Sequence, residues 1–335
     1  MSLSCIGDGP TTVIVLKWDS VVLAGRFMQS IAKSVHAVVV SWNGARWIRG
    51  ALESLQESNY PVRMVVVDNA STDGTVDIIA QSYPAVELLR MPDNLGFGRA
   101  NNQGMSYVLS KGADYVLLLN QDAKVEPSMI GKLVDIMEKH PAFGIVSPLH
   151  LDYDGERIDS GFLSYMNNNV GLVSDAYFGR LKELYEIPFM PAAIWLLSRG
   201  LLQQVGGFDP LFFMYGEDND FCNRARFHGF KIGLAPTVLG YHLHEVAYGE
   251  QATVGEKSKF YYSQLLHTLK NPECDFLPNS FSVLFRWTLS SIGNLVNFKF
   301  KNSSAIALAL LKTGANLFRI RRHYKQSRDQ GSSWL

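Results

Sequence analysis

The stretch Tyr115-Val116-Leu117-Leu118-Leu119-Asn120-Gln121-Asp122 is an apolar run of strand length that ends in polar residues and a carboxylate. Near-continuous apolar runs are typical of strands in a parallel sheet, because helices cover both faces of such a sheet. The polar end is then the carboxyl end of the strand, where open α/β sheets bind their ligands. The run therefore predicts a buried strand that delivers Asp122, a candidate metal ligand, to a binding edge.

Further apolar runs lie before and after this one and alternate with amphipathic segments. Such alternation indicates right-handed crossovers and a mainly parallel sheet flanked by helices, which is an α/β fold. Asp68, Asn94 and Asp122 follow three of the runs and should converge on one edge of the sheet. The expected strands cover residues 35–40, 64–67, 86–89, 115–119 and 144–147, and the expected helices cover residues 46–57, 71–83, 98–110 and 127–139.

Beyond residue 150 the alternation becomes less regular. We expect strands at 157–163, 189–197 and 237–239, a tight turn at 206–210, a helix at 217–228, and helices from residue 257 onward. The sequence thus divides into an N-terminal extension at 1–33 with a hairpin at 13–23, a main α/β domain at 34–262, and a helical extension at 263–335.

The charges are distributed unevenly although lysine plus arginine and aspartate plus glutamate both number 31. No acidic residue lies between Asp275 and Asp329, whereas nine lysines and arginines do. A basic amphipathic segment at 277–328 suits an anionic membrane surface, and a solvated helical subdomain or dimer face is the alternative. We expect no nucleic-acid partner.

The cysteines and the N-terminus favour a cytoplasmic protein, at the inner face of the cell membrane if the basic segment binds lipid. Cys5, Cys222 and Cys274 show neither disulfide nor zinc spacing. Charged residues interrupt the apolar N-terminal residues, so no signal peptide is expected. No apolar run approaches the ~20 residues of a spanning helix.

A second acidic block reads Gly216-Glu217-Asp218-Asn219-Asp220-Phe221-Cys222-Asn223-Arg224. Its three acids fall at the start of an expected helix, where the helix dipole favours negative charge. One carboxylate that holds a metal-bound diphosphate and another that accepts a proton would suffice for group transfer from an activated donor. A simple acidic helix start is the alternative interpretation.

Five sequence blocks in this order resemble those of family-2 inverting glycosyltransferases of GT-A fold, in the rhamnosyltransferase-like branch. The blocks are 67–75, 94–98 with Asn101-Asn102, 119–122, 206–209 and 216–221. The resemblance covers residues 35–262 and implies a nucleotide-diphospho-sugar transferase fold. It also implies an enzyme that transfers a sugar from a nucleotide-diphosphate donor.

The resemblance assigns the donor nucleotide to the loops after the first strands. Asp68 would bind the pyrimidine base and Asp73 would hold the same region. The small residues at 94–98 would let the backbone approach the diphosphate. The alternatives are that Asp73 only caps a helix and that 94–98 is a simple loop. The donor residues implied in this way are Asp68, Asn69, Asp73, Asn94, Gly96, Asn120 and Gln121.

Metal binding and catalysis are also assigned through the resemblance. Asp122 would bind Mg²⁺ or Mn²⁺ at the Asp-x-Asp position of the family, where the first acid is Asn120 in this chain. His242 would also reach the metal, and His244 is a weaker candidate. Asp218 would be the catalytic base beside Glu217, whose like charge raises its pKa. The acceptor region would contain Met190, Pro191, Ala192 and Asp220.

The expected activity is nonprocessive, because no Gln-x-x-Arg-Trp motif follows His244. We expect transfer of rhamnose from a thymidine-diphosphate donor to a cell-surface glycan or lipid-linked acceptor. A non-catalytic nucleotide-sugar-binding relative is the alternative that Asn120 supports. A nicotinamide-dependent oxidoreductase is disfavoured, because Asn101 stands where a dinucleotide fingerprint needs glycine.

Overall fold

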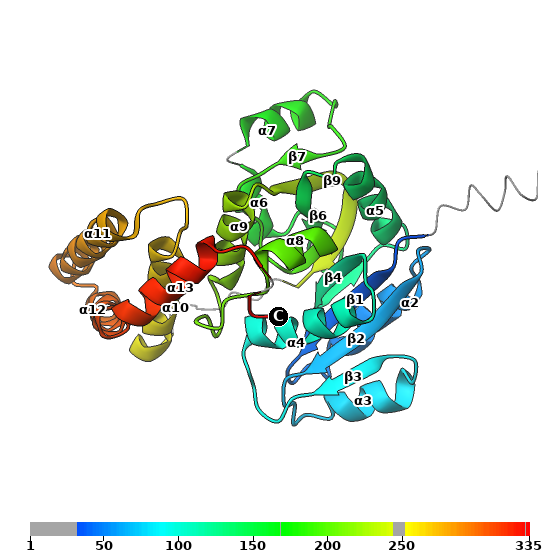
Figure 1. The fold of residues 1–335 in the computed structure, drawn as a ribbon, viewed down its shortest axis with the longest axis horizontal. Helices are drawn as coiled ribbons and strands as arrows, with labels where there is room; N and C mark the ends of the chain where they lie inside the picture. The colour runs from blue at the N-terminus through cyan, green and yellow to red at the C-terminus, as the bar shows by residue number, and fades with distance from the viewer. Residues whose placement is uncertain (1–31, 168, 244–251, 332) are drawn as a thin grey trace, which may run out of the picture. The chain divides into compact units, whose positions relative to one another are not determined.

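The computed structural model describes residues 32–167, 169–243, 252–331 and 333–335 (Figure 1). The chain forms two compact units, residues 1–33 and Ser34–Leu335, and the second unit contains nearly all described residues. The hairpin expected at 13–23 and the candidate ligand His244 lie outside the described residues.

The centre of the second unit is a mixed nine-stranded sheet. Its first half is parallel, with the order β3 (Glu87–Arg90), β2 (Val62–Asp68), β1 (Val35–Ser41) and β4 (Tyr115–Asn120). Next to β4 lies the antiparallel β8 (Ile194–Ser198), followed by β6 (Phe143–Leu151), β9 (Lys231–His242) and β5 (Ala123–Val125); β7 (Tyr185–Glu186) pairs with β9. The strands expected at 35–40, 64–67, 86–89 and 115–119 are therefore confirmed within two residues, and the one expected at 144–147 is confirmed but continues to Leu151.

Helices cover both faces of this sheet because successive side chains of a buried strand point in opposite directions. Val39 and Leu117 belong to one apolar cluster, which α2 (Ile48–Gln56) and α5 (Met129–Lys139) cover. Val38 and Val116 belong to the second, under α4 (Phe97–Ser110), α8 (Arg199–Val205) and α9 (Glu217–Phe227). The remaining early helix, α3 (Thr75–Ser82), follows β2. All expected helices up to residue 139 are confirmed.

Of the strands expected after residue 150, the one at 237–239 lies within β9, one is too long and one is wrong. The segment at 157–163 contains the start of helix α6 (Ser160–Met166), because the Asp159 side chain accepts a 2.7 Å hydrogen bond from Phe162 N and caps that helix. The strand at 189–197 begins only at Ile194. A further helix, α7 (Val170–Tyr177), was not expected and has its own side-chain cap, Asn169.

The C-terminal segment consists of α10 (Val254–Leu269), α11 (Phe276–Val296), α12 (Phe300–Ala315) and α13 (Leu317–Arg328). These helices share a third apolar cluster. The apolar segment expected at 305–320 is divided between α12 and α13, which meet at Asn316. No helix in the described part of the chain is both long and apolar enough to cross a membrane.

A buried ionic cluster joins α9 and the 206–210 turn to α10 and α13. Lys270 contacts the carboxylates of Asp209 and Asp220, the latter at 2.7 Å. Arg224 Nε lies 2.9 Å from Asp220, and His323 Nδ1 lies 2.8 Å from Asp209. Burial alone would raise the pKa of Asp209, but Lys270 and His323 hold it well below its usual range. The cluster is therefore a network of charges that satisfy one another.

The chain end packs against the same turn. Gly207 N donates a 2.9 Å hydrogen bond to Ser333 O, and the ring of Trp334 stacks on His323. Gly206 has φ 82°, and a Cβ there would collide with the Ser333 carbonyl. Glycine is thus needed at Gly206 both for its backbone conformation and for the close approach of the chain end.

Candidate active site

A cavity of about 480 Å³ opens beside the carboxyl end of β4. Asp122 and Asp218 both line it, although they are far apart in the sequence. A smaller cavity of about 160 Å³ adjoins it, because the two share Phe97, Asn120, Asp122 and Met214, and it extends to Asn69 and Asn94. The structure therefore brings the end of β4, the loop after β3 and the start of α9 to one continuous cleft.

The first group of polar residues in the cleft surrounds His242, the last residue of β9. Ala123 pairs with His242 across the β5–β9 ladder, which places His242 Nε2 3.7 Å from Asp122 Oδ1. Asn120 Nδ2 lies 3.5 Å from the same ring nitrogen. The strand pairing therefore puts three side chains that can contact a diphosphate or a metal within a few ångströms.

Asp159 was not predicted as a site residue, and it lies on the other side of the His242 ring. Its Oδ2 is 3.8 Å from His242 Nδ1, while its Oδ1 caps α6. The His242 ring therefore lies between two carboxylates, with Asp122 on the Nε2 side and Asp159 on the Nδ1 side. The sequence signal was the cap motif that begins α6, which we interpreted as a strand.

The second group is the acidic start of α9. Gly216 has φ 85°, and this left-handed residue turns the chain into the helix so that Glu217 and Asp218 face the cleft. Asp218 Oδ1 accepts hydrogen bonds from Asn219 N at 2.8 Å and Asn219 Nδ2 at 3.2 Å. Glu217 is 5% exposed, and its Oε2 has no hydrogen-bond partner among the described residues.

Burial and mutual repulsion set the protonation of this pair. Burial, followed by the charge of Asp218, raises the pKa of Glu217 to about 8. Burial also raises the pKa of Asp218, but the hydrogen bonds from Asn219 oppose the shift. Near neutral pH Glu217 therefore keeps its proton, while the hydrogen bonds from Asn219 favour the charged form of Asp218.

On the donor side, Asn69 organises the loop after β3. Asn69 Oδ1 accepts a hydrogen bond from Leu95 N at 2.7 Å, and Asn69 Nδ2 donates to Asn94 Oδ1 at 2.9 Å. Gln121 Oε1 accepts a hydrogen bond from Ser41 Oγ at 2.8 Å and joins the ends of β4 and β1. Asn69, Asn94 and Gln121 line the smaller cavity, where a nucleotide can contact them.

Asp68 and Asp73 differ in whether a carboxylate oxygen is left without a hydrogen bond within the described residues. Asp68 lines neither cavity and is 2% exposed, but its Oδ1 has no hydrogen-bond partner among the described residues, so this oxygen stays open to a ligand that reaches it. Asp73 lines neither cavity, and its oxygens accept hydrogen bonds from Ala45 N and from Thr75. Asp73 therefore fixes the turn before α3, and the N-cap of that helix is Gly74.

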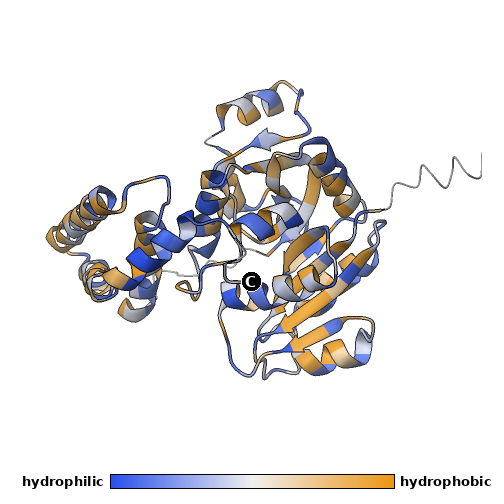
Figure 2. Cartoon of the chain, viewed as in Figure 1, coloured by the Kyte–Doolittle hydropathy of each residue, from blue (hydrophilic) through white to orange (hydrophobic). Residues whose placement is uncertain are grey.

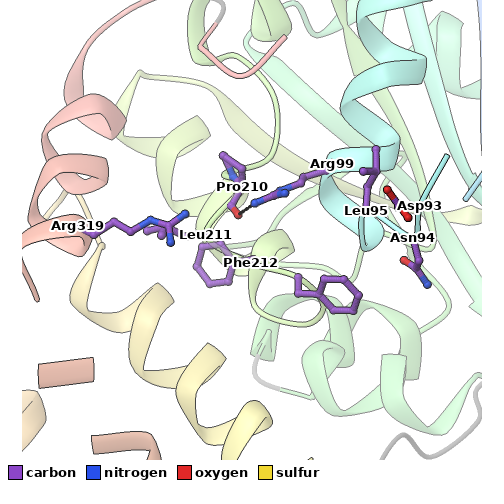
Figure 3. A pocket seen from close by; sticks show the side chains of 9 residues that line it. Asp93, Asn94, Leu95, Arg99, Pro210, Leu211, Phe212 and Arg319 are labelled. Carbon is purple, nitrogen blue, oxygen red and sulfur yellow. Dashed lines mark hydrogen bonds between the residues drawn. The ribbon is translucent and has the colours of Figure 1, made fainter. Parts of the chain in front are cut away.

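The glycines of the 94–98 loop serve packing. Gly96 has φ 81°, and a Cβ there would collide with the carbonyl of Phe213. Phe97 N donates a 3.0 Å hydrogen bond to Phe213 O, and Arg99 Nη2 donates one of 3.0 Å to Pro210 O (Figure 3). These contacts enclose a pocket of about 360 Å³ behind Asn94 and position the 210–214 loop, whose Met214 lines the cleft.

The expected acceptor region is only partly in the cleft. Pro191 and Ala192 line the larger cavity, beside Asp218. Met190 is fully buried in the second apolar cluster. Asp220 is 1% exposed and faces Lys270 and Arg224. It therefore belongs to the ionic cluster, and its expected place in the acceptor region is wrong. Asp218 thus faces the cleft, whereas Asp220, two residues further along α9, faces the core.

Comparison with known proteins shows the family of the chain. The sequence profile of glycosyl transferase family 2 matches residues 36–206, about half of the chain, including the ends of β2 and β4. The chain belongs to glycosyl transferase family 2. This match argues against a nicotinamide-dependent oxidoreductase. It confirms the expected enzyme class, a glycosyltransferase.

Two curated relatives of this glycosyltransferase are rhamnosyltransferases. The N-acetylglucosaminyl-diphospho-decaprenol L-rhamnosyltransferase of Mycobacterium tuberculosis is 30% identical over 228 residues, which cover 61% of this chain and 74% of the relative. The dTDP-rhamnosyl transferase RfbF of Shigella flexneri is 25% identical over 211 residues, which cover 62% and 69%.

Two solved structures confirm that the glycosyltransferase has a GT-A fold. The mannosyltransferase PcManGT from Pyrobaculum calidifontis, in complex with GDP-Man and Mn²⁺, has a TM-score of 0.53 at 18% identity and covers 89% of this chain and 93% of its own. S. aureus TarS 1–349 in complex with UDP has a TM-score of 0.52 at 13% identity and covers 88% and 80%.

The cleft of the glycosyltransferase contains two side chains, Asp122 and His242, that can be tested as ligands of a divalent cation. No group of three or more His, Cys, Asp or Glu side chains within residues 32–243 and 252–335 is arranged to hold a metal by itself. Asp122 and His242 face one another in the cleft with hard-oxygen and imidazole ligands, and diphosphate oxygens and water commonly complete such a shell. The donor set fits a cation bound together with the nucleotide-sugar.

The raised pKa of Glu217 gives the glycosyltransferase a pH-dependent stability. The folded chain binds this proton up to about pH 8, whereas an unfolded glutamate loses it near pH 4.5. Between those values the folded state holds more protons, so the free energy of unfolding should fall as pH rises. We expect Glu217→Gln to remove most of this fall, as measured by urea unfolding at several pH values across the window.

The control for Glu217→Gln is Glu57→Gln, at the exposed end of α2. This variant should reproduce the pH profile of the wild type. If Glu217→Gln shifts the free energy of unfolding by the same amount at both ends of the window, Glu217 does not hold the proton.

Proposed function

We propose that this glycosyltransferase is an inverting, nonprocessive enzyme that transfers rhamnose from a thymidine-diphosphate donor to a cell-surface glycan or a lipid-linked acceptor. The single observation that carries the proposal is that Asp122 and Asp218 line one cavity. The adjoining smaller cavity reaches Asn69 and Asn94, which suits the nucleotide part of the donor. The rhamnosyltransferases among the relatives support the choice of sugar.

In this mechanism Asp218 accepts the proton of an acceptor hydroxyl as its oxygen attacks the anomeric carbon. A bond forms between that oxygen and the carbon, and the bond from the carbon to the diphosphate oxygen breaks on the opposite face. Asp122 and His242 would hold the cation, which would neutralise charge on the leaving diphosphate. Asp159 keeps the His242 ring oriented.

The proposal is tested by donor binding and turnover with the purified full chain. TDP-rhamnose should raise the melting temperature more than UDP-GlcNAc or GDP-mannose, because a ligand that binds only the folded state stabilises it. It should also be hydrolysed slowly in the absence of acceptor. A larger shift with another nucleotide-sugar would reassign the donor, and no shift with any of them would overturn the proposal.

The metal ligand is tested in the same assay. We expect Asp122→Ala to lose the part of the donor-induced shift that depends on Mg²⁺ or Mn²⁺, because the remaining ligand, His242, cannot hold the cation alone. Asp135→Ala, on the exposed face of α5, is the matched control and should keep that part. An unchanged metal dependence in Asp122→Ala would rule out Asp122 as a ligand.

The second candidate is a nucleotide-sugar-binding protein without turnover. Asn120 favours it, because this neutral amide stands where the family has its first acid and lies 3.5 Å from His242 Nε2. Donor-induced stabilisation without hydrolysis or transfer, with metal present, would select this candidate.

A further inference from the structure

Helix α11 is apolar on two sides, and only one of them is covered. Phe276 and Val283 are buried in the third apolar cluster, and Trp287 packs against it. A second row of large apolar side chains on α11 is more than half exposed: Leu277 67%, Phe281 76%, Phe285 56%, Leu289 51%, Ile292 52% and Val296 70%. Figure 2 shows the concentration of hydrophobic residues on α11, in contrast to the hydrophilic α13.

The exposed row forms one continuous stripe. With 3.6 residues per turn, its spacing of three and four residues keeps these side chains within about 120° of the helix circumference, roughly opposite Val283. The stripe runs for about 30 Å along the helix. Exposed apolar surface of this extent normally marks a binding surface.

The turn after α11 continues the stripe and adds charge. Phe298, Lys299, Phe300 and Lys301 are all exposed, with Phe298 at 80%. Phenylalanine and lysine therefore alternate at this tip. We call the stripe together with residues 298–301 the α11 surface.

The charge of this region selects the partner. The segment between Asp275 and Asp329 has nine basic residues and no acidic one. In a symmetric dimer the α11 surface would face its own copy, and the segment offers no carboxylate to meet Lys299 or Lys301. An anionic bilayer supplies both an apolar layer for the phenylalanines and phosphates for the lysines.

We propose that the α11 surface docks this protein on an anionic lipid bilayer, with α11 lying in the plane of the interface. Leu277, Phe281, Phe285 and Leu289 enter the boundary between headgroups and acyl chains. Lys299 and Lys301 contact lipid phosphates. The docking is independent of the proposed sugar transfer, and it would bring the enzyme to a membrane where a lipid-linked acceptor resides.

The test is co-sedimentation of the full chain with vesicles of phosphatidylcholine, with and without phosphatidylglycerol. The wild type should bind the anionic vesicles, and its binding should weaken at high salt. Phe281→Glu/Phe285→Glu should bind at least about tenfold more weakly to the anionic vesicles, since both changes put a charge into the acyl boundary. Lys299→Ser/Lys301→Ser should lose about tenfold and show a smaller salt dependence.

The matched control is Tyr177→Ser/Phe178→Ser, which removes two exposed aromatic rings from the end of α7. This variant should bind vesicles like the wild type. Donor hydrolysis in solution should be unchanged in all three double variants, so failure of docking and failure of the enzymatic proposal are separate results.

Three outcomes would overturn the docking proposal. The first is no binding of the wild type to anionic vesicles. The second is equal binding of the Phe281→Glu/Phe285→Glu variant and the wild type. The third is a dimer in analytical ultracentrifugation that this variant dissociates while vesicle binding is unaffected, which would assign the α11 surface to a second copy of the chain.

Discussion

Asp218→Asn should lower the rate of sugar transfer by about 10²–10⁴-fold, which is the usual contribution of a positioned general base. The amide keeps the size of the side chain but cannot accept the hydroxyl proton. Donor binding should survive, because Asn69, Asn94 and Gln121 line a different part of the cleft. Single-turnover kinetics together with a donor titration would separate the two effects.

The matched control for Asp218→Asn is Asp135→Asn on the exposed face of α5, which should retain full activity. The melting temperature of Asp218→Asn should also remain near the wild-type value, because the amide keeps the size of the side chain and its oxygen can still accept the hydrogen bonds from Asn219. A loss of less than tenfold at saturating substrates would remove Asp218 from the role of base.

Lys270→Met should lower the free energy of unfolding by about 3–5 kcal/mol, the usual cost of removing one partner from a buried ionic group. Lys270 is fully buried and contacts both Asp209 and Asp220. Without its ammonium group, Asp220 would keep Arg224 as its charged partner and Asp209 would keep His323. Urea unfolding of the variant and the wild type measures the difference.

Two further variants make the Lys270 result specific. Lys139→Met breaks the exposed ion pair with Glu183 and should change the free energy of unfolding by less than about 1 kcal/mol. Adding Asp209→Asn to Lys270→Met removes one uncompensated charge and should recover part of the loss. If the double variant is less stable than Lys270→Met, unpaired charge is not the cause.

The parallel half of the sheet was predictable because its signal is local. Each of its strands is a short apolar run, and β2 and β4 end in polar residues that reach the binding edge. The antiparallel β8 lies between β4 and β6 in the sheet. No local pattern indicates that insertion, because it depends on pairing between segments about eighty residues apart.

The acidic block at the start of α9 shows that long-range contacts also escape sequence-based prediction within the site. The sequence placed Glu217, Asp218 and Asp220 together at a helix start, and that placement is correct. It could not show that Asp220 faces away from the cleft, because its partner Lys270 lies fifty residues later. Asp159 was missed for a related reason, since its contact with His242 is also long-range.

The packing of the chain end beside Gly206 bears on how the protein is handled in the laboratory. Leu335 packs against the second apolar cluster, and the ring of Trp334 stacks on His323, which belongs to the ionic cluster. An affinity handle or fluorescent fusion attached after Leu335 would have to leave from a packed side of the core.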